Sequence, residues 1–288
     1  MVPVIARRAG FTLVEVLVAA VLSGVALGAV GLLLQSNQRF YRSQSQILDV
    51  EEGLRAVAQL LPAELRELSA QGGDILAMGR DSITLRAMRS LGIVCAEPDA
   101  STGSVVLADS LTFAWRAADP SRDRALVFRD GDPATADDDR WLDLGIGSVR
   151  TGAACSDGSA GTALTLTGAT EQLDGVTPGA PLRTYERVTY RLYADDQGLS
   201  WLGERGYSSA GWSALSPVAG PLRRGGGLQL DYYDSTGAAT ADPGAVARVR
   251  VAVRGLSAGP IDEPGRTSSG RAYEDSLVVQ AALRNGRP

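Results

Sequence analysis

GFTLVEVLVA, residues 10–19, opens an apolar run, residues 11–34, that carries one ionisable side chain, Glu15. A helix of that length reaches about 36 Å at roughly 1.5 Å per residue, which is enough to cross a hydrocarbon core of about 30 Å. Arg7 and Arg8 immediately precede the run, and a basic flank marks the cytoplasmic side of a membrane. The sequence therefore predicts one membrane-spanning helix near the N-terminus, with the remaining chain on the other side.

Glu15 is an unusual residue for a membrane span. A carboxylate at the centre of a spanning helix costs about 2.5–3.5 kcal/mol on insertion scales, so such residues mark a function with a specific partner. Gly24, Gly28 and Gly31 would let other helices approach closely. A secretory signal would have a shorter apolar core that ends in an A-x-A-like cleavage site, which this run lacks. The alternative left open is an uncleaved anchor in which Glu15 has no role.

The segment from Ala6 to Leu34 resembles the class III signal of type IV pilins and pseudopilins. A short leader that ends in Gly10, followed by Phe11 and Glu15, falls in the register of that signal. The resemblance implies cleavage between Gly10 and Phe11 by a prepilin peptidase, and N-methylation of Phe11. It also implies that Glu15 pairs with the α-amino group of a neighbouring subunit during assembly. The implied partners are the peptidase, other pilins or pseudopilins, the inner-membrane assembly platform and membrane lipid.

The composition excludes most common enzyme classes. The chain has no histidine and no lysine, so all 28 basic residues are arginines. Without these two residue types the chain cannot build a histidine-based triad, a histidine metal ligand, a Schiff-base lysine or a Walker lysine. The net charge of −5 also argues against a nucleic-acid partner, because such domains usually present a basic face. We therefore expect no enzymatic activity and no cofactor.

Cys95 and Cys155 are the only cysteines of the chain. Both follow the predicted span, and the basic flank places them outside the cytoplasm, where a pair usually forms a disulfide bond. Closing a loop of about 60 residues contributes roughly 4 kcal/mol in the chain-entropy model. The sequence therefore predicts a Cys95–Cys155 disulfide; two buried free thiols are the alternative.

A second helical pattern follows the apolar run. Residues 35–72 are polar at first and contain no proline before Pro62, and their apolar residues recur with the i, i+3, i+4, i+7 spacing of an amphipathic helix. We expect one helix from Phe11 to about Leu61, after which Pro62 either kinks it or begins a new turn that ends before Gly72. The expected apolar face consists of Ile47, Leu48, Leu54, Val57, Ala58, Leu61, Leu65 and Leu68.

From residue 74 onward the apolar period changes to two, which is typical of half-buried strands. Turns rich in glycine, proline and aspartate separate these segments, and no further helical pattern is present, so we expect a mostly antiparallel β-rich domain. The expected strands are residues 82–87, 111–116, 125–129, 187–193, 228–232, 248–254 and 276–279.

The fold class expected from these patterns is α+β. A long N-terminal helix, with a membrane half and an amphipathic half, packs on an antiparallel β-rich C-terminal domain, which is the lollipop plan of pilins. The expected divisions are a leader peptide (1–10), a transmembrane helix (11–34), its amphipathic continuation (35–72) and a β-rich extracytoplasmic domain (73–288).

The C-terminal part carries a second, less specific resemblance. Its strand spacing is similar to that of PilW-like minor pilins and J-type pseudopilins. The segments that carry the similarity are residues 190–193, 228–237, 246–251 and 278–285.

An acidic segment is the remaining candidate for a metal site. Five aspartates could supply oxygen ligands for Ca²⁺, which takes six to eight of them. The spacing does not fit the EF-hand pattern, so a solvated acidic loop is the favoured interpretation. These aspartates are Asp130, Asp132, Asp137, Asp138 and Asp139.

The sequence thus predicts a minor pilin-like structural subunit of a type IV pilus or type II secretion pseudopilus, in the priming or tip complex. It would sit in the bacterial inner membrane with a cytoplasmic N-terminus and a periplasmic C-terminal domain, and then join the fibre. The alternative is an adhesin or DNA-uptake subunit displayed on the fibre. DNA uptake would need an arginine-rich groove, for which the candidates are Arg223, Arg224, Arg248, Arg250 and Arg254.

Overall fold

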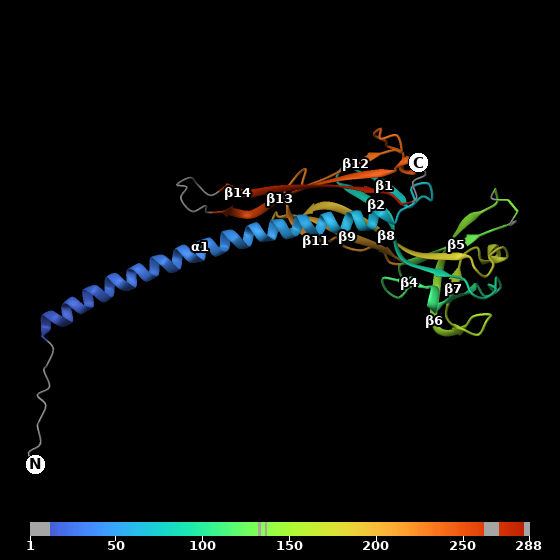
Figure 1. Ribbon diagram of the computed structural model, residues 1–288, viewed down its shortest axis with the longest axis horizontal. Helices are drawn as coiled ribbons and strands as arrows, with labels where there is room; N and C mark the ends of the chain where they lie inside the picture. The colour runs from blue at the N-terminus through green and yellow to red at the C-terminus, as the bar shows by residue number, and fades with distance from the viewer. Residues whose placement is uncertain (1–11, 132–133, 136, 262–270, 285–288) are drawn as a thin grey trace, which may run out of the picture. The chain divides into compact units, whose positions relative to one another are not determined.

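The computed structural model describes residues 12–131, 134–135, 137–261 and 271–284 (Figure 1). The chain divides into two compact units. The first comprises Met1–Asp49 and Ser257–Tyr273, and the second comprises Val50–Leu256 and Glu274–Pro288. Because helix α1 (Leu13–Arg66) and strands β13 (Arg248–Ile261) and β14 (Arg271–Ala282) contribute to both units, each unit is described by itself.

The first unit contains the apolar part of α1. Leu13, Leu22 and Leu32 leave 85%, 64% and 70% of their surface exposed. The other large apolar side chains of this run are also exposed. By length and composition α1 is able to cross a membrane, and it is the one such helix among the described residues. Nearer the end of this unit, the Gly259 amide donates a hydrogen bond of 3.2 Å to Gln46.

The second unit begins with the amphipathic end of α1. Val50, Leu54, Val57, Leu61 and Leu65 are all at most 3% exposed. Their spacing of three and four residues places them on one face of the helix, so this face forms part of a hydrophobic core. The predicted amphipathic helix is thereby confirmed for its second half. Leu48, which was expected on the same face, is instead 53% exposed.

Helix α1 ends at Arg66, beyond the expected end at Leu61 and before Gly72. Pro62 lies inside the helix and is itself buried. A proline in a helix interior removes one backbone hydrogen bond. Leu61 and Leu65 on either side of it are fully buried, and tertiary packing of an apolar face supplies most of the stability of a helix in a protein. The burial of these leucines therefore carries the helix past the proline.

The remainder of the chain forms an antiparallel sheet, so the predicted α+β fold class is confirmed. Three short 3₁₀ helices, η1 (Asp109–Leu111), η2 (Thr170–Leu173) and η3 (Pro243–Ala245), interrupt the strands. The other strands are β1 (Ile75–Met78), β2 (Ser82–Ile93), β3 (Ser104–Ala108), β4 (Phe113–Ala114), β5 (Asp123–Arg129), β6 (Arg140–Ala154), β7 (Ala160–Thr167), β8 (Pro181–Ala194), β9 (Ser200–Ser208), β10 (Gly211–Trp212), β11 (Ser216–Leu222) and β12 (Leu228–Tyr233).

The main path of the sheet has the order β12-β13-β11-β9-β8-β5-β6-β7-β3. Strand β2 is not on this path and pairs with β8. Strand β8 is central because it pairs with β2, β5 and β9 along its length. Its registers bring Glu186 opposite both Ala87 of β2 and Asp123 of β5. Strand β2 thus pairs with a strand that lies about a hundred residues later in the chain.

A core cluster of the second unit lies among β3, β5, β6, β7 and the start of β8. Val105, Ala125, Val127 and Leu182 in this cluster are completely buried. Nearby, Cys95 and Cys155 are joined in the disulfide bond that the sequence predicts, with their Cα atoms 5.1 Å apart. The bond ties the chain after β2 to the chain after β6.

The expected strand 111–116 is wrong for most of its length. Leu111 ends η1, and only Phe113 and Ala114 form a strand, β4, which pairs with Ser90 and Leu91 of β2. The alternation of apolar and polar residues there does not correspond to a buried face, because β4 is exposed on both of its residues.

Candidate functional site

Both predicted processing residues, Gly10 and Phe11, lie outside the described residues. The description begins with Thr12, which directly precedes the first turn of α1. The Thr12 amide donates to the Glu15 carboxylate at 3.0 Å, and the Glu15 amide donates to the Thr12 hydroxyl at 3.2 Å. The Thr12 hydroxyl also lies 3.1 Å from the same carboxylate.

This reciprocal pair is a capping box, which satisfies two backbone donors that a helix start otherwise leaves free. Thr12-x-x-Glu15 matches its sequence signature, so inspection of the sequence could have found it. Glu15 therefore has a local role in starting α1, in addition to the assembly role that the resemblance implies.

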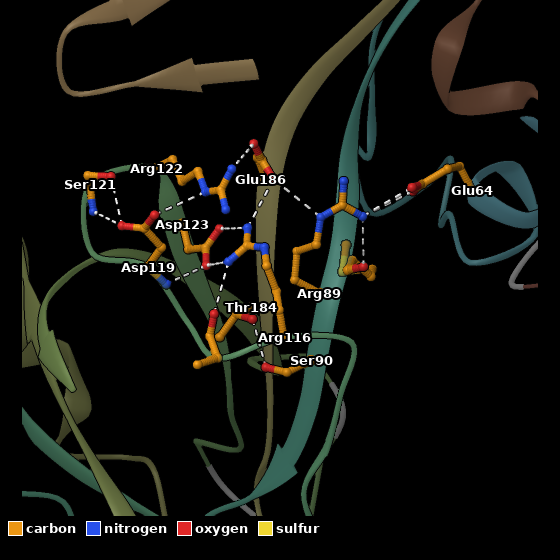
Figure 2. A network of polar contacts seen from close by, with 12 residues as sticks. Glu64, Arg89, Ser90, Arg116, Asp119, Ser121, Arg122, Asp123, Thr184 and Glu186 are labelled. Carbon is orange, nitrogen blue, oxygen red and sulfur yellow. Dashed lines mark hydrogen bonds and ion pairs between the residues drawn. The ribbon is translucent and has the colours of Figure 1, made fainter. Parts of the chain in front are cut away.

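The second unit contains a network of arginines and carboxylates centred on Glu186 of β8 (Figure 2). One Glu186 oxygen accepts from Arg116 at 2.9 Å and from Arg89 at 3.3 Å. Arg116 also donates two hydrogen bonds of 2.6 Å each to the Asp123 carboxylate. Figure 2 shows these side chains converging from β2, β5, β8 and the segment before β5. The arrangement is a bidentate, charge-assisted clamp between chain segments that are distant in sequence.

The network continues on both sides of Glu186. On one side Arg89 reaches Glu64 of α1 at 3.1 Å, and on the other Arg122 lies 3.6 Å from Glu186 and 3.1 Å from Asp119. A further carboxyl, Glu204, adjoins Glu64 and Glu186, and burial raises the pKa of Glu204. The hydrogen bonds to Asp123 raise the pKa of Arg116.

The ion pairs of this network join segments that are distant in sequence. Every arginine in it forms an ion pair with a carboxylate, and hydrogen bonds to Asp123 hold that side chain in place at one end of β5. Through these pairs the network connects α1 to β2, β5 and β8. Sequence inspection did not identify it, because Arg89, Arg116 and Glu186 meet only through strand pairing.

An exposed apolar edge lies beside β4. Phe113 and Trp115 leave 75% and 86% of their surface exposed, and Leu91 and Leu111 leave 45% and 52%. The Trp115 amide donates to the Arg89 carbonyl at 2.9 Å, which extends the pairing with β2. A groove of about 520 Å³ adjoins these residues.

The described part of the acidic segment gives no support to the Ca²⁺ hypothesis. Asp130, Asp137, Asp138 and Asp139 are described, whereas Asp132 lies outside the described residues. Within the described ranges, no group of three or more acidic or cysteine residues is arranged to hold a metal ion.

Three of the five arginines considered for DNA binding interact with neighbouring side chains. Arg250 lies 2.8 Å from Asp231, and Arg223 lies 3.4 Å from Glu274. The guanidinium of Arg248 stacks on the Tyr233 ring, 5.0 Å from its centroid. The charges of Arg223 and Arg250 are therefore partly neutralised within the protein.

Comparison with known proteins gives one match, at the N-terminus. Residues 5–31 match the family model described as the prokaryotic N-terminal methylation motif, which is the signal of type IV pilins. The chain has no significant match among curated proteins or solved structures. The matched segment covers Gly10, Phe11 and Glu15 as well as the first part of α1. The chain thus carries the N-terminal signal of a type IV pilin-like fibre subunit, joined to an apolar helix suited to membrane anchoring.

Proposed function

We propose that this protein is a minor pilin-like structural subunit of a type IV pilus or of a type II secretion pseudopilus. A prepilin peptidase would remove residues 1–10 by cutting between Gly10 and Phe11, and Phe11 would then be N-methylated. The subunit would be assembled through α1, with Glu15 pairing the terminal amine of a neighbouring subunit. The observation that carries the proposal is the match of residues 5–31 to the methylation motif, which extends into the exposed apolar part of α1.

The membrane arrangement follows from the same segment. Residues 11–34 would span the inner membrane, and Arg7 and Arg8 favour a cytoplasmic N-terminus. The β-rich domain would then lie in the periplasm, where Cys95 and Cys155 can be oxidised. The disulfide bond between them supports this orientation.

The role as a minor subunit rests on size and on strand spacing. A chain of 288 residues is larger than the bulk component of such fibres usually is, and its C-terminal strand spacing is similar to that of PilW-like minor pilins and J-type pseudopilins. This step is an analogy within the family. The resulting proposal is a subunit of the priming or tip complex that acts structurally, without catalysis.

The decisive experiment is processing of a Gly10→Val variant in cells that contain a prepilin peptidase. The parent should yield a mature chain that begins with N-methylated Phe11, and the variant should remain longer by the ten-residue leader. Gly31→Val is a matched control, because a Cβ at Gly31 has no neighbouring atom within 4 Å, and it should be cut like the parent. Intact-mass measurement distinguishes the two forms. Normal cleavage of Gly10→Val would contradict the proposal.

A further inference from the structure

A ladder of four side chains lies on strands β8, β9 and β10 of the second unit. The guanidinium of Arg187 stacks on the Tyr207 ring at 4.1 Å from its centroid, and that of Arg205 stacks on the Trp212 ring at 4.7 Å. The two rings meet edge to face, with centroids 5.2 Å apart. We name these four residues the Arg–aromatic ladder.

Strand register produces the ladder. Tyr207 of β9 is opposite Trp212 of β10, and Val188 of β8 is opposite Gly206 of β9. Arg187 therefore lies next to Tyr207, since Arg187 precedes Val188 and Tyr207 follows Gly206 in these antiparallel strands. Arg205 is two positions before Tyr207 and so shares its face of the sheet. All four side chains thus belong to one face.

The two arginines of the ladder differ from those of the charge network. Within the described residues, neither Arg187 nor Arg205 forms an ion pair with a carboxylate, whereas Arg116 grips Asp123 with both of its terminal nitrogens. The Nε of Arg205 is buried and has no hydrogen-bond partner among the same residues. A stacked guanidinium keeps its remaining donors in a fixed planar fork, which matches the geometry of a carboxylate.

Two hollows flank the ladder. One, of about 330 Å³, is lined by Arg205, Tyr207, Ser213 and Ser216, among others. The other, of about 220 Å³, is lined by Arg187, the same Tyr207 and Ser208. Trp212 leaves 40% of its surface exposed, so part of its indole can contact a ligand. A concave surface with an aromatic ring and a few polar groups is typical of small-ligand sites.

We propose that the Arg–aromatic ladder binds a carboxylated sugar of an acidic polysaccharide. The arginine forks would take the sugar carboxylates, the exposed part of Trp212 would take the apolar face of a ring, and Ser216 would contact ring hydroxyls. This inference goes beyond the structural role proposed above, because it gives the fibre subunit a ligand of its own.

A uronic-acid polymer fits the charges better than DNA does. Glu186 and Glu204 line the larger hollow, and Asp123 lines the smaller one. A duplex carries one negative charge per about 1.7 Å of its axis, so its backbone would pass these carboxylates with strong repulsion. A sugar chain with one carboxylate per ring can instead place each charge at an arginine.

The test uses the full-length protein in lipid nanodiscs and two oligosaccharides of equal length. Galacturonic acid oligosaccharide should bind saturably and more weakly as salt increases, and the neutral galactose oligosaccharide should not bind. A double-stranded DNA oligonucleotide is the third probe. Equal binding of the neutral sugar, preferred binding of DNA, or no saturable binding of the galacturonic acid probe would each overturn the proposal.

Matched variants locate the site. Arg187→Gln and Arg205→Gln should each weaken binding about tenfold, which is the loss expected for one hydrogen-bonded charge. Arg250→Gln is the control, because Arg250 is already paired with Asp231 and should leave the affinity unchanged. Far-ultraviolet circular dichroism and the intact disulfide show that each variant is folded. Unchanged affinity in both ladder variants would also overturn the proposal. None of these measurements requires processing or fibre assembly.

Discussion

Thr12 and Glu15 are joined by reciprocal hydrogen bonds at the start of α1: the Thr12 amide donates to the Glu15 carboxylate, and the Glu15 amide donates to the Thr12 hydroxyl. The residue that the pilin-like signal assigns to subunit pairing thus also caps its own helix. Replacing Glu15 by leucine would remove both the charge and the cap, so loss of assembly in that variant would have two explanations.

Variants that separate charge from capping resolve this. Glu15→Gln keeps a side chain suited to the capping box but removes the charge that would attract a neighbour's terminal amine. We expect Glu15→Gln to be processed and retained in the membrane, yet to be strongly reduced in sheared fibres. Glu15→Leu should insert at least as well as the parent, because an ionised side chain is unfavourable in lipid, and it should also be lost from fibres.

Thr12→Val is the complementary control, since it keeps the carboxylate and removes the hydroxyl that the Glu15 amide uses. It should cost about 1 kcal/mol at the helix start and still enter fibres. Membrane fractionation measures how much of each variant is retained in the membrane, and immunoblotting of sheared fibres measures how much is incorporated. Equal incorporation of Glu15→Gln and the parent would show that the Glu15 charge does not act in assembly.

Gly53 should be essential for packing α1 on the sheet. A Cβ added to Gly53 would lie 2.5 Å from the carbonyl oxygen of Gly220 in β11, which is backbone and cannot rotate away. Alanine normally favours a helix over glycine by about 1 kcal/mol, but overpacking costs about 1–3 kcal/mol, so we expect Gly53→Ala to be destabilised. Gly24→Ala, which meets nothing within 4 Å, should leave the stability of the β-rich unit unchanged.

Tryptophan fluorescence during denaturant unfolding in detergent measures this difference, since all four tryptophans lie in the second unit. A Gly53→Ala variant as stable as the parent would mean that α1 can shift away from β11 without loss of packing.

Removing the disulfide should destabilise the second unit. Cys95 and Cys155 are separated by 60 residues, and cross-links that close loops of such length typically contribute about 2–4 kcal/mol. We expect a Cys95→Ala and Cys155→Ala double variant to unfold at a lower denaturant concentration than the oxidised parent. The reduced parent should behave like the variant, and non-reducing peptide mapping of exported protein should show the two cysteine peptides linked. Free, alkylatable thiols in the exported parent would contradict the prediction.

Asp74 should make the protein lose stability as the pH rises. Its side chain is completely buried, with one oxygen accepting from the Ser69 amide at 2.8 Å and the other without a hydrogen bond among the described residues. Burial raises the pKa of Asp74 above that of the unfolded chain. The contribution of the protonated Asp74 side chain to the free energy of unfolding is therefore fully present below the unfolded pKa. It is lost as the pH rises through the higher folded pKa.

Relative to Asp74→Asn, the parent should thus lose unfolding free energy as the pH rises above about 4, the pKa of an aspartate in the unfolded chain, and through the higher folded pKa. Asp234→Asn provides a comparison of opposite sign, because hydrogen bonds from Thr236 lower the pKa of Asp234. The parent should gain stability relative to that variant as the pH rises from the lower folded pKa to the unfolded pKa, above which the contribution of Asp234 is complete. Parallel slopes for the parent and Asp74→Asn would show that the buried carboxyl titrates normally.

The sequence alone determined the features that depend on neighbouring residues. The apolar run, Thr12-x-x-Glu15 and the three- and four-residue spacing of Leu54, Val57 and Leu61 are local patterns, and the helix that they indicate is present in α1. Period-two alternation likewise identified the parts of β2, β5, β8, β12, β13 and β14 that pair in the sheet. Helix periodicity and strand alternation are read within a few turns or residues, so no long-range information is required.

Only the tertiary structure decided which strands meet and in what register. Arg89, Arg116 and Glu186 are scattered over about a hundred residues, and Arg187 reaches Tyr207 only because β8 and β9 pair as they do. A shift of one residue in that pairing would turn every side chain of a strand to the opposite face. Strand 111–116 was wrongly expected for the same reason: its alternating pattern has no buried partner to match, and pairing with β2 covers only Phe113 and Ala114. The contacts that form the network and the ladder are therefore fixed by strand pairing, which local sequence does not specify.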